Sequence, residues 1–326
     1  MAAARTARAW PWVIALLAIA LVAVLAIGSW ATWRPLSEYD AARLTARDIV
    51  TSVGESPRIE VPLESVDRQL SALGPAASPA QRDRLDEFSD QAPESGTDQS
   101  SSARGGQDEV PGDIELRAAA TRMFDLAQDQ DDPQLATTMA AIAASWSAES
   151  TREDPATQPI MRTGEDEAAA RDARSEPAET GTAADERCTP ELTAVATQLD
   201  HSLFTARSAD ARNTDSGELE KTLDEWQQNL QRIQEDTAVA GLYECEPRPA
   251  RGGYQLPSVI AEDPAAATAA TAQELSEYAA GASGTVAPDE RAWLLDVLES
   301  SSRAQALLQP SDPVPALAGE PLMSDR

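Results

Sequence analysis

The chain has 326 residues, with 55 acidic and 26 basic side chains, a formal net charge of −29, two cysteines and one histidine. A field of this sign repels nucleic acid and anionic polymers, so we expect neither as a partner. Aromatic residues make up only 4% of the chain and the hydrophobic total leans on alanine, which favours helices over sheet. We therefore expect an all-α protein.

The first predicted element is an apolar run over residues 10–33. No charged residue lies between Trp12 and Trp33, and a helix of that length is roughly 33 Å long, which is enough to cross a bilayer. Tryptophans lie at both ends of the run, as is typical of residues at a membrane interface: Trp10, Trp12, Trp30 and Trp33. The run predicts a single transmembrane helix that anchors the protein in the cell membrane.

The charges that flank the run predict its orientation. Arg5 and Arg8 precede it without a nearby acid, so the positive-inside rule places residues 1–9 in the cytoplasm and the bulk of the chain outside. A cleaved signal peptide is the alternative, because the triplets at 26–28 and 29–31 each have small residues at their first and third positions, the two that a signal peptidase inspects. The length of the run and its terminal tryptophans favour the uncleaved anchor.

The next segments alternate between helical and polar patterns. Residues 34–112 combine two juxtamembrane helices, over 36–53 and 63–73, with a polar stretch from 91 to 112 that we expect to be disordered. Residues 113–149 predict a helical hairpin, in which Asp132 caps the second arm and Pro133 takes its first position. Residues 150–187 are charged and broken by prolines, and are interpreted as a disordered, flexible acidic linker.

The strongest helical pattern begins at residue 188. Leu192, Val195, Leu199 and Leu203 form one apolar stripe after a Thr189-Pro190 start, and a second stripe follows from Leu219 to Ile233. An antiparallel hairpin of these helices brings Cys188 and Cys245 to the same end, so we predict a disulfide between them. Two further helices, starting at Asp263-Pro264 and Pro288-Asp289, complete a predicted four-helix bundle over 188–309. The proline-rich tail, 310–326, is expected to be disordered.

Several stretches of this region resemble a known family. They are TPELTAVATQLDHSLFTARS, GGYQLPSVIAEDPAAATAATAQELSEYAAGASG and DERAWLLDVLESSSRAQALL, of which the YQLP element before the Asp263-Pro264 helix start is the most specific. Together they are similar to a ferritin-like domain of unknown function found in exported or membrane-anchored proteins of high-GC Gram-positive bacteria. The resemblance implies a four-helix bundle of ferritin architecture and no assigned activity.

A catalytic or metal-binding set is hard to assemble from the sequence. The di-iron pattern of ferritin-like proteins needs Glu-x-x-His on two helices, whereas the chain has only His201, preceded three positions earlier by Gln198. Asp200 could pair with His201, and Glu191, Glu218 and Glu225 could approach it from neighbouring helices. We interpret His201 as a partly exposed helix residue, keep it as a weak metal candidate, and expect no catalytic residue and no cofactor.

These observations predict a protein that is not an enzyme. We expect a membrane-anchored extracytoplasmic interaction or scaffold module at the cell envelope, with an unidentified envelope protein as partner and an acidic bundle tethered on a long flexible arm. A carboxylate-based metal-binding ferritin-like protein is the alternative, and a hydrolase of envelope polymers is a third hypothesis. The sequence leaves open whether the 113–149 hairpin docks on the bundle.

Overall fold

The computed structural model describes residues 36–79, 81–82, 115–156, 159–160, 162, 188–213, 217–245, 253–288 and 291–319. All secondary structure in these ranges is helical, which confirms the all-α fold class. Within them, no helix is both long enough and apolar enough to span a bilayer. The apolar run 10–33, with its four tryptophans, lies outside the described residues, as does the polar stretch 91–112.

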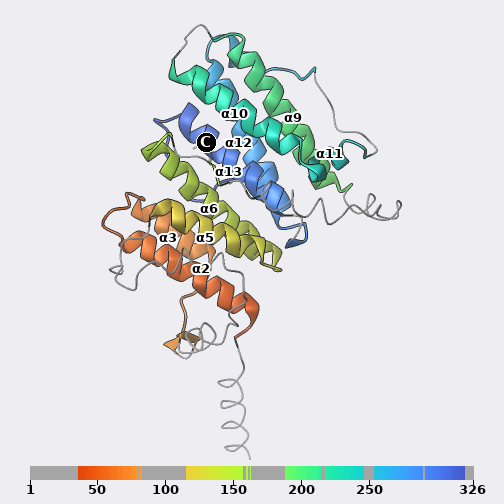
Figure 1. Cartoon of the computed structure of the whole chain (residues 1–326). Helices are drawn as coiled ribbons and strands as arrows, with labels where there is room; N and C mark the ends of the chain where they lie inside the picture. The colour runs from red at the N-terminus through yellow and green to blue at the C-terminus, as the bar shows by residue number, and fades with distance from the viewer. Residues whose placement is uncertain are drawn as a thin grey trace, which may run out of the picture.

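Pairs of helices are stacked in layers (Figure 1). In chain order the pairs are α2 (Glu38–Glu55) with α3 (Leu63–Ala72), α5 (Leu116–Gln128) with α6 (Pro133–Glu153), α9 (Pro190–Asp210) with α10 (Glu218–Gln234), and α12 (Pro264–Ser283) with α13 (Ala292–Leu308). The α12–α13 pair lies between the α5–α6 pair and the α9–α10 pair. Two short helices, α11 (Thr237–Leu242) and η2 (Ser258–Ala261), lie along the chain between α10 and α12.

Three helices begin with the same local signal, a capping side chain followed by proline. Asp132 accepts a hydrogen bond from the Leu135 N–H at 2.8 Å, and Asp263 does the same for Ala266 at 2.9 Å. Thr189 caps α9 in the same way. Each cap satisfies a backbone donor that the first helical turn leaves unpaired, and proline loses nothing at a position where its missing N–H has no partner. These starts fall where the sequence predicts them.

Helix α13 is the centre of the molecule. It contacts α6 and α5 on one side and α12 and α10 on the other, and most of its side chains are buried. A helix that is covered all round requires its polar residues to find partners inside the protein. The buried Asp296, Glu299 and Arg303 on this helix are therefore the groups whose contacts matter most.

Helix α12 is rich in alanine, and the structure gives these alanines a packing role. Ala267, Ala272 and Ala279 are fully buried where α12 contacts α9 and α13. Small side chains let helix backbones approach closely, and this compensates for the small apolar area that each alanine buries. Because α12 is covered on several sides, its sequence does not show one apolar stripe opposite a polar face.

The helical hairpin docks, which the sequence left open. Helix α5 contacts α2, and α6 contacts α13, so the layers from α2 to α10 are connected through one continuous series of helix contacts. Helix α2 begins at Glu38, five positions after Trp33. The expected long flexible arm between the apolar run and the C-terminal helices is therefore wrong, because the intervening helices bury their apolar faces against each other.

Two segments expected to be disordered are ordered in part. Helix α6 continues to Glu153, and Ile160 and Arg162, from the expected linker 150–187, bond to α13. Residues 310–319, from the expected tail 310–326, run along α6, where the Ala318 N–H donates to the Ala141 carbonyl at 3.0 Å. The described non-helical parts of these segments, 159–160, 162 and 310–319, use their backbone groups to bond neighbouring helices. Residues 163–187 and 320–326 lie outside the described ranges.

Candidate functional site

His201 is half-buried on α9 and packs against a tyrosine from a distant segment. Its ring stacks on Tyr254 with centroids 4.9 Å apart and an interplanar angle of 28°. Its Nδ1 lies 3.4 Å from Oε1 of Gln198, and its Nε2 finds no hydrogen-bond partner within the described part of the chain. The histidine is thus placed as an aromatic neighbour of Tyr254.

The hydroxyl of Tyr254 belongs to a polar network that links the segment after α11 to α9. It lies 3.0 Å from Oδ2 of Asp200 and 3.3 Å from the Thr197 carbonyl. Gln234, at the end of α10, donates to Oδ1 of Asp200 at 3.2 Å. Burial, together with the hydrogen bond and charge of Asp200, raises the pKa of the Tyr254 hydroxyl above its ordinary value. The phenol therefore stays protonated and acts as a hydrogen-bond donor, not as a base or nucleophile.

The carboxylates that could have approached His201 are used elsewhere or face solvent. Glu191 and Glu218 are exposed, and Glu225 forms an ion pair with Arg303 of α13, with 3.8 Å between Oε1 and Nη2. Glu274 reaches the neighbourhood only through Gln198, whose Nε2 donates to its Oε2 at 3.0 Å. Among the described residues, no group of three or more His, Cys, Asp or Glu side chains is placed to hold a metal ion.

The predicted disulfide is confirmed. Cys188 and Cys245 are bonded, with an S–S distance of 2.05 Å and Cα atoms 5.5 Å apart. The bond joins the residue before the Thr189 cap of α9 to the turn after α11, so it closes the α9–α10 hairpin at the end where the topology predicted it.

Sequence reasoning missed a buried charge cluster against α13. Asp296 and Glu299, one turn apart on this helix, have fully buried side chains, and the Arg162 side chain between them is 8% exposed. Nη1 of Arg162 lies 3.1 Å from Oδ1 of Asp296 and 3.4 Å from Oε2 of Glu299. The guanidinium carbon lies 3.7 Å from the centroid of the Phe124 ring on α5, within cation–π range. Ser147 of α6 donates to Oε1 of Glu299 at 2.7 Å.

Burial raises the pKa of the Glu299 carboxyl, while Arg162, the Ile160 N–H, the Ser147 hydroxyl and Arg303 act in the opposite direction. Desolvation is the largest of these effects, as expected for a carboxyl group inside a helical layer. The sequence signal for the cluster is the three-residue spacing of Asp296 and Glu299 beside the apolar residues of the first half of α13. Such a pattern is ordinarily interpreted as a solvated face.

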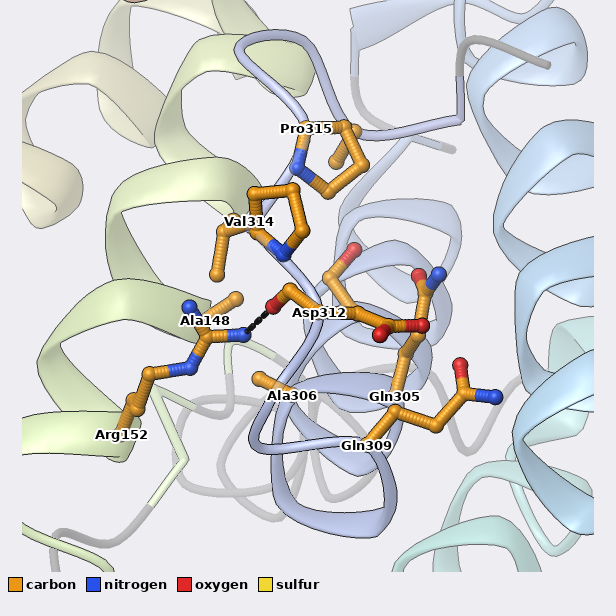
Figure 2. A pocket seen from close by; sticks show the side chains of 11 residues that line it. Ala148, Arg152, Gln305, Ala306, Gln309, Asp312, Val314 and Pro315 are labelled. Atoms are coloured by element: carbon orange, nitrogen blue, oxygen red, sulfur yellow. Dashed lines mark hydrogen bonds between the residues drawn. The ribbon is translucent and has the colours of Figure 1, made fainter. Parts of the chain in front are cut away.

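Two of the cavities that border these layers lie beside α6. A small cavity of about 20 Å³ lies between α6, α13 and the C-terminal segment, where Arg152 donates to the Asp312 carbonyl (Figure 2). A wider groove of about 530 Å³ lies between α3, the start of α6 and the end of α12, with Tyr39, Leu135 and Thr138 in its lining. The lining of this groove has no acidic or basic side chain and therefore no acid–base pair.

Comparison with protein-family models, with curated proteins and with solved structures finds no match to this chain.

Proposed function

We propose that the protein is a membrane-anchored extracytoplasmic helical protein that acts as a non-catalytic interaction or scaffold module at the cell envelope. The observation that carries the proposal is that the buried arginines bind groups of other helices and segments of the protein. Arg43 of α2 donates to the carbonyls of Leu73 and Pro75 after α3, Arg291 joins the ends of α5 and α12, and Arg162 is held by the acids of α13. These charges connect structural elements to one another.

The helix contacts support a further part of the proposal, a four-helix bundle of ferritin architecture over 188–309. Helix α9 contacts α10, α10 contacts α13, α13 contacts α12, and α12 contacts α9, which closes a ring of four. The long connection between α10 and α12 is the single crossover of such a bundle. The bundle is extended by the α5–α6 pair, which packs on the outer side of α13.

The membrane anchor rests on the charge-free run that ends at Trp33, and the helical layers begin within a few residues of it. The helical layers would therefore lie next to the outer face of the cell membrane. Alkaline extraction of membranes followed by protease treatment of intact cells tests this arrangement. The full chain should stay in the membrane pellet and be degraded from outside, and release of the chain by alkaline extraction would contradict the anchor.

The interaction role is tested by chemical cross-linking in intact cells and affinity purification of the tagged full chain. The matched control carries residues 1–37, with the same tag, and lacks all of the helical layers. We expect at least one envelope protein to be enriched with the full chain over the control. The same set of cross-linked proteins from both would contradict the role that we assign to the helical layers.

A further inference from the structure

The charge cluster on α13 resembles a peptide-binding site that is already filled by a segment of the same chain. Its walls come from three helices: Phe124 from α5, Ser147 from α6, and Asp296 with Glu299 from α13. Its occupant is a non-helical piece of the same chain, represented by Ile160 and Arg162. No other described segment donates both backbone and side-chain groups to these two acids.

The site holds the backbone of the occupant as well as its charge. The Ile160 N–H donates to Oε1 of Glu299 at 2.9 Å, and the Arg162 N–H donates to both oxygens of Asp296, at 2.9 and 3.1 Å. Each carboxylate therefore accepts from a main-chain N–H and from the guanidinium. Charge-assisted hydrogen bonds of this kind strengthen the binding of a segment and also determine which of its residues lies at each position of the site.

Two side chains give the site its selectivity. Ile160 is partly buried against the hydrophobic core, so the site accepts an apolar residue two positions before the arginine. The flat guanidinium of Arg162 lies over the Phe124 ring, a contact that suits arginine better than the compact ammonium group of lysine. The pattern that fits the site is an apolar residue, any residue, then arginine.

Arg162 does not use all of the hydrogen-bonding capacity of its guanidinium. Only Nη1 reaches the carboxylates, while Nε and Nη2 are buried and find no partner within the described residues. Buried guanidinium N–H groups without partners are costly, so the intramolecular segment binds less well than its chemistry allows. An untethered segment can shift to bring a second nitrogen toward the acids.

We propose that Phe124, Ser147, Asp296 and Glu299 form a peptide-binding site for an apolar-x-Arg segment, filled in cis by Ile160 and Arg162 and open to an arginine-bearing segment supplied in trans. The ligand is a short non-helical peptide with one guanidinium group. Small alkylguanidinium compounds share one feature with it, a cation that can lie over the Phe124 ring. The proposal goes beyond the scaffold role and does not rest on it.

The test frees the site in the full chain with the double substitution I160S and R162A. The probe is a synthetic peptide with the sequence of residues 159–164, Pro-Ile-Met-Arg-Thr-Gly, added in increasing amounts during thermal unfolding followed by circular dichroism. Binding to the folded state raises the melting temperature in a saturable way. We expect such a rise for the double variant and a smaller one for the wild-type chain, whose own segment competes.

The control peptides separate recognition from general effects of salt or charge. Replacing the peptide arginine by lysine or alanine should weaken binding by roughly tenfold or more, since the planar charge over Phe124 is lost. Methylguanidinium chloride supplies the cation without the backbone, and binding of this compound as tight as that of the peptide would overturn the peptide assignment. Equal effects of the arginine and alanine peptides would overturn the site itself.

A second variant covers the case in which the double variant does not fold. R162Q removes the charge but keeps hydrogen-bonding atoms at the same position, and the same peptide titration applies to it. Adding E299Q to R162Q should abolish the rise in melting temperature, because the acceptor for the first backbone N–H and for the guanidinium is weakened. A peptide effect that persists unchanged in R162Q/E299Q would contradict binding at this site.

Discussion

Nε of Arg291 donates a hydrogen bond to the carbonyl oxygen of Ser283, 2.7 Å away, at the end of α12. The same guanidinium donates through Nη1 to the carbonyls of Ala127 and Gln130, at and just after the end of α5, at 2.5 and 2.7 Å. The last carbonyls of a helix have no partner within it and carry the negative end of the helix dipole. One buried cation therefore satisfies the ends of two helices.

We predict that R291M destabilises the protein by about 3 kcal/mol or more, because it preserves much of the side-chain volume but leaves several buried carbonyls without donors. Urea unfolding followed by circular dichroism measures the loss. The control is R68M, since Arg68 is exposed on α3 and should change stability by less than about 0.5 kcal/mol. Similar losses for the two variants would contradict the role of Arg291.

Two glycines near the end of α12 offer a matched pair. A Cβ atom added at Gly284 would lie 2.5 Å from the Pro133 carbonyl oxygen and 2.7 Å from the Thr137 hydroxyl, whereas one added at Gly281 would meet nothing within 4 Å. G284A should therefore lower stability by about 1–3 kcal/mol, as overpacking does, and G281A should raise it by about 0.5–1 kcal/mol through helix propensity. Melting temperatures that move in the same direction would contradict the close approach of α12 to the start of α6.

Local signals predicted much of the helical layout. Asp132-Pro133, Thr189-Pro190 and Asp263-Pro264 each mark a helix start, because capping chemistry acts within a few residues of the cap. The disulfide was also predictable, since two apolar stripes joined by a short turn fix which ends meet. These features depend on residues that are close in the sequence or on one simple topology.

The buried charge contacts depend on long-range packing and were not predictable. Arg162 meets Asp296, and Arg291 meets Ala127, across more than 130 positions in the chain. The three-residue spacing of Asp296 and Glu299 is the same on a solvated helix face as on one covered by α6. For the same reason Gln69, whose side chain donates to the Ala316 carbonyl at 2.8 Å, gave no sign that the segment after α13 is ordered.

The Cys188–Cys245 bond closes a loop with a sequence separation of 57. Replacing both cysteines by serine should cost up to about 4 kcal/mol by the chain-entropy estimate. Unfolding in urea with and without a thiol reductant measures this: the wild-type chain should lose stability on reduction, and C188S/C245S should not respond. A response of the double variant to the reductant would show that the loss arises elsewhere in the chain.

At Tyr254, a substitution can remove the hydrogen bond to Asp200 while it keeps the ring stacked on His201. Y254F keeps a ring against His201 but removes the hydroxyl that bonds Asp200, and we expect a loss of about 1 kcal/mol. D200N combined with Y254F should cost less than the sum of the two single changes, because the two groups interact directly. In spectrophotometric titration of the wild-type chain, the raised pKa of Tyr254 should appear as a phenol that ionises above the ordinary range, and this component should be missing from Y254F. Strict additivity of the two substitutions would contradict the interaction.

Glu149 on α6 predicts a pH dependence of stability. Burial raises the pKa of its carboxyl, the nearby Glu153 adds to this, and Arg152 acts in the opposite direction. A carboxyl group whose pKa is higher in the folded than in the unfolded state holds its proton more tightly when folded. Its contribution to stability is therefore greatest below the unfolded pKa and falls as the pH rises through the raised folded value.

The substitution E149Q removes this titration, so the difference in unfolding free energy between E149Q and the wild-type chain should shift in favour of the variant as the pH rises from about 4 to 7. Urea unfolding at a series of pH values measures the difference, with D67N as control because Asp67 is exposed on α3. A difference that stays constant with pH, or shifts in favour of the wild-type chain, would mean that the ion pair with Arg152 outweighs desolvation. The two groups are 3.5 Å apart and both are partly exposed, so solvent weakens their attraction, and we expect desolvation to dominate.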